Sequence, residues 1–426
     1  MDIASVTLPR WTLGLAFSLS LFSTVSAQGR HRDYDDVDPW AGFQSSGPVA
    51  DSATVASFLA GLATSSPIVC QMAGQSLGNH WGSRDDDENR IGILAGEETL
   101  EKQRDALNQS ISPDAISFLI GSLGDSHPCV RRAAARLLGE SELDEATRRL
   151  RNALHNENPR VREAAALGLA HADDSSSLHD LIAALKDPDQ SVVRMAAYAL
   201  GELEDARAVK PLTDLLKSKD ADTRVTAAAA LGDIEDIRAA EQLTSLVKDS
   251  DPAVRLAAVH ALGQLQDYRG TGALNDALMD RDVRIRRAAA EALGQVESLK
   301  AADPLGKALG DSDPVVRRLA AQALGELDGL KKAPERLVEA LADRDAELTV
   351  IAAMSLGQIG DTTAVPALAA AYRSDNPRLR YAVVSALSDL DDRRADDLLD
   401  VASKDRDQEV RHKAAEALKD RDHDDD

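Results

Sequence analysis

The chain is poor in aromatic residues, in cysteine and in positive charge. Phe, Trp and Tyr make up 3% of its 426 residues while hydrophobic residues as a group make up 43%, so the apolar content is mostly Ala, Leu and Val. Small aliphatic side chains suit closely packed helices better than a β-sandwich or a barrel. Lys and Arg number 49 against 72 Asp and Glu, and the net charge is −23. A field of this sign repels nucleic-acid phosphates and anionic lipid headgroups, so we expect neither as a partner.

The acidic charge has two interpretations, which the sequence leaves open. It is compatible with a partner of basic charge, and it is equally explained by the need for a soluble surface. Catalytic signatures are also missing. The sequence contains no His-Glu dipeptide, no H-E-x-x-H, no Gly-rich phosphate loop and no G-x-S-x-G. We therefore expect no catalytic residue, no metal site and no cofactor.

Residues 1–27 have the pattern of a secretory signal peptide. Arg10 supplies the positive charge, the stretch from Trp11 to Phe22 is apolar, and small residues end at Ala27. The apolar stretch is too short to span a membrane, and we expect no membrane insertion. Residues 28–50 are polar and without periodicity, as in a disordered leader. A secreted or periplasmic protein is the prediction.

A three-residue phrase, Ala-Leu-Gly, repeats along the middle of the chain. Successive glycines are 31 residues apart, at Gly201, Gly232, Gly263, Gly294 and Gly325. The series extends backwards to Gly139 and, after one inserted residue, forwards to Gly357. Self-similarity at a fixed period of this length is typical of stacked helical hairpins.

Two charged series accompany the glycines. Eight residues before the glycine lies an arginine, in the series Arg131, Arg162, Arg224, Arg255, Arg286, Arg317, Arg380 and Arg411. Six residues before the arginine position lies an acidic or amide residue in most repeats, including two whose arginine position holds another residue. The series is Asp125, Asn156, Asp187, Asp249, Asp280, Asp311, Asp343 and Asp405. Turns such as Asp249 to Pro252 suit a helix start, because Asp caps the first N–H groups and Pro tolerates the first turn. Each repeat is therefore predicted to be a Leu-bearing first helix, an Asp-rich turn and an Ala-rich second helix. The glycine near the end of the second helix allows either a close helix approach or a left-handed cap.

The stretch from Asp311 to Gly325 is the clearest copy of D-x-D-P-x-V-R-x-x-A-x-x-A-L-G, and it resembles the HEAT repeat of phycobilin lyases and deoxyhypusine hydroxylase. The resemblance covers residues 112–419. It implies an all-α fold, an α-solenoid of about ten 31-residue HEAT-like helical hairpins that form a curved superhelix. It also implies that the turn aspartates and helix arginines bond within and between repeats, and that the second helices line the concave side. The iron-binding His-Glu dipeptides of deoxyhypusine hydroxylase are absent here.

Residues 51–111 are expected to be a degenerate N-terminal repeat and a charged connector. Cys70 takes the arginine position of that repeat, and Cys129 lies in the next recognisable one. If residues 81–111 form a full repeat, the two cysteines are too far apart for a disulfide; if the segment loops out, the bond is feasible. Both alternatives stay open, and Cys70–Cys129 is a candidate disulfide. Residues 420–426 are predicted to be an acidic tail.

The positions best suited to recognition lie one and five places beyond the arginine series. They are four residues apart and therefore share one face of the second helix. They vary between repeats while their neighbours stay Ala or Leu. The candidate binding residues are Arg132, Arg136, His260, Arg287, Glu291, Arg318, Gln322, Tyr381 and His412. A binding face and an ordinary solvated face both fit this pattern.

Variable side chains on a rigid array favour a non-catalytic scaffold of the cell envelope or exterior that recognises a protein or peptide along its concave face. One alternative is a HEAT-like lyase or isomerase acting on a small molecule. Another is an accessory or regulatory subunit of a membrane-bound protease or sensor. A long shallow groove would favour the scaffold, and a deep pocket with converging titratable groups would favour the enzyme.

Overall fold

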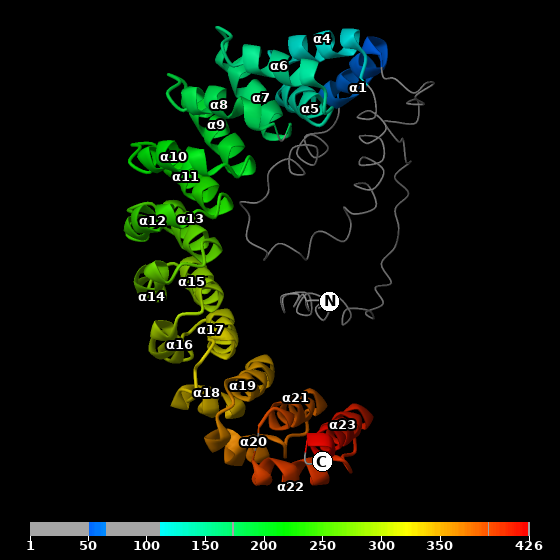
Figure 1. The fold of residues 1–426 in the computed structure, drawn as a ribbon, viewed down its shortest axis with the longest axis vertical. Helices are drawn as coiled ribbons and strands as arrows, with labels where there is room; N and C mark the ends of the chain where they lie inside the picture. The colour runs from blue at the N-terminus through cyan, green and yellow to red at the C-terminus, as the bar shows by residue number, and fades with distance from the viewer. Residues whose placement is uncertain (1–50, 65–110, 173, 391, 425–426) are drawn as a thin grey trace, which may run out of the picture. The chain divides into compact units, whose positions relative to one another are not determined.

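The computed structural model describes residues 51–64 and 111–424, except positions 173 and 391. Within residues 111–424 the chain forms ten helical hairpins that follow one another in two rows (Figure 1). Helix α1 (Ser52–Thr64) packs on the first hairpin. The predicted signal segment, the leader and most of residues 51–111, Cys70 among them, lie outside the described residues. The predicted α-solenoid is confirmed.

One row contains the second helices of the hairpins, and each of these helices packs directly on the next. They are α5 (Pro128–Gly139), α7 (Pro159–Ala170), α9 (Gln190–Glu202), α11 (Ala221–Asp233), α13 (Pro252–Gln264), α15 (Val283–Val296), α17 (Pro314–Glu326), α19 (Ala346–Ile359), α21 (Pro377–Ser388) and α23 (Gln408–Asp424). The last of these, α23, continues to Asp424, so the predicted acidic tail starts within a helix.

The other row contains the first helices, which contact one another much less. They are α4 (Pro113–Ser122), α6 (Asp144–Ala153), α8 (Leu178–Ala184), α10 (Val209–Leu215), α12 (Ala240–Leu246), α14 (Thr271–Ala277), α16 (Ala302–Ala308), α18 (Glu335–Glu339), α20 (Val365–Ala371) and α22 (Arg393–Ala402). Short 3-10 turns lead into several of them, namely η3 (Ser175–Ser177), η4 (Ala206–Ala208), η5 (Ile237–Ala239), η6 (Tyr268–Gly270), η7 (Leu299–Ala301) and η9 (Thr362–Ala364), and η8 (Ala340–Ala342) follows α18.

Asp side chains start most of the second helices, as the sequence predicts. The carboxylate of Asp251 accepts a hydrogen bond from the backbone N–H of Ala253, and Pro252 occupies the first helical position. Asp189, Asp220, Asp282, Asp313 and Asp345 act in the same way. Such caps stabilise a helix by about 1 kcal/mol each because they satisfy N–H groups that have no partner within the helix.

The core is a double row of leucines with the period of the repeat. The Leu of each Ala-Leu-Gly phrase, from Leu200 to Leu324, is fully buried, and so are the equivalent Leu356 and Leu387. A Leu of the first helix is also fully buried in each repeat from Leu212 to Leu399. Burying one such side chain contributes about 2 kcal/mol. Because each leucine contacts only its own and neighbouring hairpins, the stability of the array is distributed along its length.

The glycine of each phrase allows consecutive second helices to approach closely, because it has no side chain between them. A Cβ atom added to Gly263 would lie 2.9 Å from the Cβ of Ala292, and one added to Gly357 would lie 2.6 Å from the Cα of Ala386. Of the two roles that the sequence allowed, close approach is the one observed. The left-handed residue lies three positions later, at Glu204, Glu235, Gln266 and Glu297, with φ between 48° and 53°.

Candidate binding interface

Arginine–aspartate pairs connect most consecutive repeats. The guanidinium of Arg255 in α13 donates to both carboxylate oxygens of Asp280, which follows α14, and its Nη1 donates to the backbone oxygen of Asp249 at 3.0 Å. We call pairs of this kind the forward ion pairs. They are Arg162–Asp187, Arg224–Asp249, Arg255–Asp280, Arg286–Asp311 and Arg380–Asp405. Bonding within and between repeats is therefore confirmed, and these residues fix the stacking register.

In the repeat of α9, Val193 occupies the arginine position, and the turn aspartate of the following repeat is also replaced. In the next repeat Ser218 takes the place of the turn aspartate. The arginine is shifted by one residue, to Arg194, and pairs with Asp220 at 3.1 Å. The connection between the two repeats is therefore kept although both of its members have moved.

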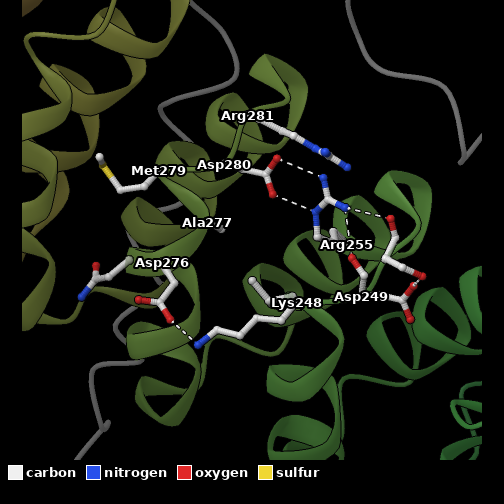
Figure 2. A pocket seen from close by; sticks show the side chains of 11 residues that line it. Lys248, Asp249, Arg255, Asp276, Ala277, Met279, Asp280 and Arg281 are labelled. Atoms are coloured by element: carbon white, nitrogen blue, oxygen red, sulfur yellow. Dashed lines mark hydrogen bonds and ion pairs between the residues drawn. The ribbon is translucent and has the colours of Figure 1, made fainter.

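A shallow depression lies around one forward ion pair. It has a volume of about 560 Å³ and is lined by residues from Val247 to Arg281. Figure 2 shows the guanidinium of Arg255 between Asp280 and the turn at Asp249, with Lys248 and Asp276 paired beside it. Because these charged groups already bind one another, the depression holds a structural pair and no evident catalytic arrangement.

The candidate binding residues all lie on one side of the second-helix row, and none is buried. Arg132, His260, Glu291, Gln322, Tyr381 and His412 are exposed, and Arg136, Arg287 and Arg318 are partly exposed. We call this surface the second-helix face. It also carries the exposed side chain of Met354 in α19. The face therefore mixes charged, polar and apolar groups, and their order changes from repeat to repeat.

Among the nine candidates, Arg287 and Arg318 each bind an aspartate of the next repeat. The guanidinium of Arg287 donates to both oxygens of Asp313, at 3.0 and 2.9 Å, and that of Arg318 donates to both oxygens of Asp345, at 2.9 Å each. Asp313 and Asp345 also cap α17 and α19. A partner that bound either guanidinium would have to compete with these charge-assisted bonds.

Shifted pKa values mark the middle of the second-helix face. Desolvation by the surrounding protein lowers the pKa of His260, although the charge of Glu291 acts in the opposite direction. Desolvation also raises the pKa of Glu326, and the charges of Glu291 and Glu297 add to that effect. A neutral His260 together with carboxylates that repel one another would favour a cation on this part of the face.

A second series of ion pairs, which the sequence did not predict, lies in the turns that lead into the first helices. Asp236 caps η5 and binds Arg238, whose Nη2 also donates to the backbone oxygen of Ala206 in the preceding repeat, at 3.0 Å. The same arrangement occurs at Asp267–Arg269 and Asp392–Arg394. An Asp-x-Arg pattern at the repeat period was the signal that could have revealed it.

Cys129 is buried and takes part in a disulfide. Its predicted partner, Cys70, lies outside the described residues, so the pairing stays a prediction. Among residues 51–64 and 111–424 no group of three or more His, Cys, Asp or Glu side chains is arranged to hold a metal ion. In the same part of the chain no helix combines the length and the apolar character that a membrane span requires.

Comparison with known protein families agrees with this geometry. The family model for HEAT repeats matches residues 147–229, 215–279, 271–349 and 334–419. These matches overlap and together cover more than half of the chain, so the chain belongs to the HEAT-repeat family. A comparison with curated protein sequences finds no match.

Two solved importin structures share the fold. Importin beta in an ammonium sulfate condition is 14% identical, with a TM-score of 0.57, over 86% of this chain and 57% of that chain. Kap95p, in a structure that describes its binding to RanGDP, is 14% identical, with a TM-score of 0.51, over 85% of this chain and 56% of that chain. The chain thus spans a little over half the length of either importin, and at this identity the likeness shows the fold alone.

A structure of the CpcE–CpcF complex of phycocyanin lyase from Nostoc is 24% identical over 64% of this chain and 94% of that chain. Its TM-score is 0.34. A similarity of this size carries no argument about activity.

Proposed function

We propose that this HEAT-repeat protein is a non-catalytic scaffold that binds a protein or peptide along its second-helix face. One observation carries the proposal: the framework recurs in most repeats while the face varies. Forward ion pairs recur from Arg162 to Asp405 with the same spacing of 25 residues. The face changes from Arg132 in the first hairpin to Tyr381 and His412 in the last two. Variable side chains on a rigid repeating support suit recognition of an extended partner.

A partner with basic segments fits the charge of this surface. The chain as a whole carries −23 charges. The raised pKa of Glu326 means that its charged form is poorly stabilised in the free protein, since desolvation and two neighbouring glutamates oppose it. A Lys or Arg side chain of a partner would relieve this repulsion. On the same face, the exposed Met354 and Tyr381 would supply apolar contacts to the partner.

The proposal includes a location in the cell envelope or outside the cell, because residues 1–27 have the pattern of a signal peptide. The test is N-terminal sequencing of the protein recovered from envelope and culture-fluid fractions of its source organism. A mature chain that begins at Gln28 supports export. An uncleaved chain recovered only from the cytosol contradicts it.

The binding proposal is tested with immobilised full-length chain and an extract of the envelope and secreted proteins. We expect one saturable partner that elutes as the salt concentration rises. The variant Met354→Ser/Tyr381→Ser should retain far less of it, because both side chains are exposed on the second-helix face. Met279→Ser is the matched control, since Met279 is exposed but lies in the turn after α14. Equal retention by all three chains would exclude the second-helix face as the binding surface.

A further inference from the structure

Three large apolar side chains are exposed at the same position of three consecutive repeats. Ile237, Tyr268 and Leu299 are 53%, 69% and 51% exposed, and each is the first residue of a 3-10 turn, in η5, η6 and η7 respectively. Single exposed apolar residues are common on soluble proteins. A regular row across neighbouring repeats is different, because it forms one continuous surface.

Hydrogen bonds from one repeat to the next hold these turns in a row. The Nη2 of Arg269 in η6 donates to the backbone oxygen of Ile237 in η5 at 2.8 Å. On the other side, Asn275 in α14 donates to the backbone oxygen of Lys300 in η7 at 3.3 Å. Consecutive turns therefore lie side by side. We define the turn ridge as Ile237, Tyr268 and Leu299 together with the basic side chain that follows each of them, Arg238, Arg269 and Lys300.

On the turn ridge the arginines are more exposed than the aspartates that bind them. The side chain of Arg238 is 64% exposed while that of its partner Asp236 is 17% exposed. In the next repeat Arg269 lies outside and Asp267 is buried beneath it. Exposed glutamates at Glu235 and Glu297 flank the ends of the ridge, and a neutral Gln266 takes this position beside Tyr268. The centre of the ridge is therefore an exposed aromatic ring with a guanidinium next to it.

The spacing of the ridge matches an extended peptide. Neighbouring helices in a stack are about 8–10 Å apart, and equivalent turns repeat at a similar distance. A peptide in the polyproline conformation has three residues per turn and advances about 3.1 Å per residue, so three residues cover one repeat and residues three apart point to the same side. A bound peptide would thus place every third side chain over Ile237, Tyr268 and Leu299 in turn.

We propose that the turn ridge binds an extended acidic peptide segment of a partner protein that carries an apolar side chain at every third residue. The apolar side chains contact Ile237, Tyr268 and Leu299. The intervening carboxylates pair with Lys300 and with the Nη1 groups of Arg238 and Arg269, because Nε and Nη2 of these arginines already bind Asp236 and Asp267. This site goes beyond the proposed function, because it lies on the turns that precede the first helices and not on the second-helix face. The two proposals can therefore fail independently.

The test uses the full-length chain and a labelled synthetic peptide of the sequence DLDDYDPLD, whose apolar residues lie three apart. Fluorescence anisotropy should show saturable binding that weakens as salt is added, because salt screens the guanidinium–carboxylate attraction. The variant Ile237→Ser/Tyr268→Ser removes only exposed side chains. It should bind about tenfold or more weakly, as when an anchoring aromatic residue is removed from an interface.

Two controls make the result specific. Met354→Ser, on the second-helix face, should bind the peptide as the unmodified chain does. The peptide DLDYDLDPD, with the same composition but apolar residues two apart, should bind more weakly. Circular dichroism of both variants checks that the helices are intact. Equal binding by the ridge variant, equal binding of the two peptides, or no saturation at about 1 mM peptide overturns the proposal. So does a concentration-dependent dimer that the ridge variant abolishes, since the occupant would then be a second copy of the chain.

Discussion

Arg255 and Asp280 are joined by two hydrogen bonds, 2.8 Å from Nε to Oδ2 and 3.1 Å from Nη2 to Oδ1. Their side chains are 7% and 12% exposed. Asp280→Ala leaves a nearly buried guanidinium without its carboxylate, and the expected loss of stability is about 2 kcal/mol. The measurement is the urea midpoint of the full chain, together with amide hydrogen exchange in α13 and α15, where protection should fall most.

The matched control for this variant lies four residues earlier, near the end of α14. Asp276 forms an ion pair with Lys248 at 2.8 Å, but both side chains are largely exposed. Water and salt screen such a pair, so Asp276→Ala should leave the urea midpoint nearly unchanged. An equal effect of both substitutions would show that burial does not govern the strength of these pairs.

The forward ion pairs should make stability depend on acid pH. Hydrogen bonds from Arg162 and Arg286 lower the pKa of Asp187 and Asp311 below the ordinary value of 3.8, more than burial raises it. Since the folded pKa is the lower one, the stabilisation is complete well above pH 3.8 and is lost as the pH falls through and below that value. Urea midpoints measured between about pH 6 and pH 2 should therefore fall steeply at the acid end. Asp311→Asn should flatten this fall, and an unchanged slope would contradict the assignment.

Glycines at different places should respond to alanine with opposite signs. In Gly357→Ala the new Cβ meets the backbone of α21 at 2.6 Å, so the helices must separate, at a cost of about 1–3 kcal/mol. In Gly272→Ala, within α14, nothing lies within 4 Å of the new Cβ. This variant should gain up to about 1 kcal/mol, because alanine is the better helix former. Thermal unfolding of the two chains measures the difference, and a loss in both would contradict this account.

The left-handed residues after the second helices offer a stabilising change. Glu235 has φ 53°, where a side chain costs about 1 kcal/mol, while Gly360 takes the equivalent position after α19 at φ 73°. Glu235→Gly should therefore stabilise the array by about 1 kcal/mol. Gly360→Ala should destabilise it by a similar amount, and urea titrations of both variants test the pair. A loss of stability in Glu235→Gly would mean that the glutamate side chain contributes contacts that outweigh its backbone strain.

The sequence predicted the architecture because the repeat copies its physical causes. A Leu that must be buried, an Asp that caps a helix and an Arg that reaches the next turn recur with one period, so ten similar hairpins could be recognised together. The role of Gly263 was left between two possibilities, because both leave the same residue in the sequence. Only the distance to Ala292 separates close approach from a left-handed cap.

The candidate surface was predicted less completely. The spacing placed His260, Tyr381 and the other candidates on one face of the second helices, and the structure agrees. The spacing within one helix could not show that Arg287 is held by Asp313, because Asp313 lies 26 positions away in the next repeat. The turn ridge was missed for a related reason. Ile237, Tyr268 and Leu299 differ in type, so a search for identical residues does not find them.

The forward ion pairs have a consequence for how such a chain can lengthen or shorten. Each pair begins in one repeat and ends 25 residues later in the next, so removing one full period leaves the remaining arginines and aspartates matched. Deleting residues 250–280 would remove Arg255 and Asp280 together and leave Arg224–Asp249 and Arg286–Asp311 complete. Duplicating the same stretch would add one complete pair. Gene duplication and deletion can therefore change the reach of the molecule in whole repeats without leaving a buried charge behind.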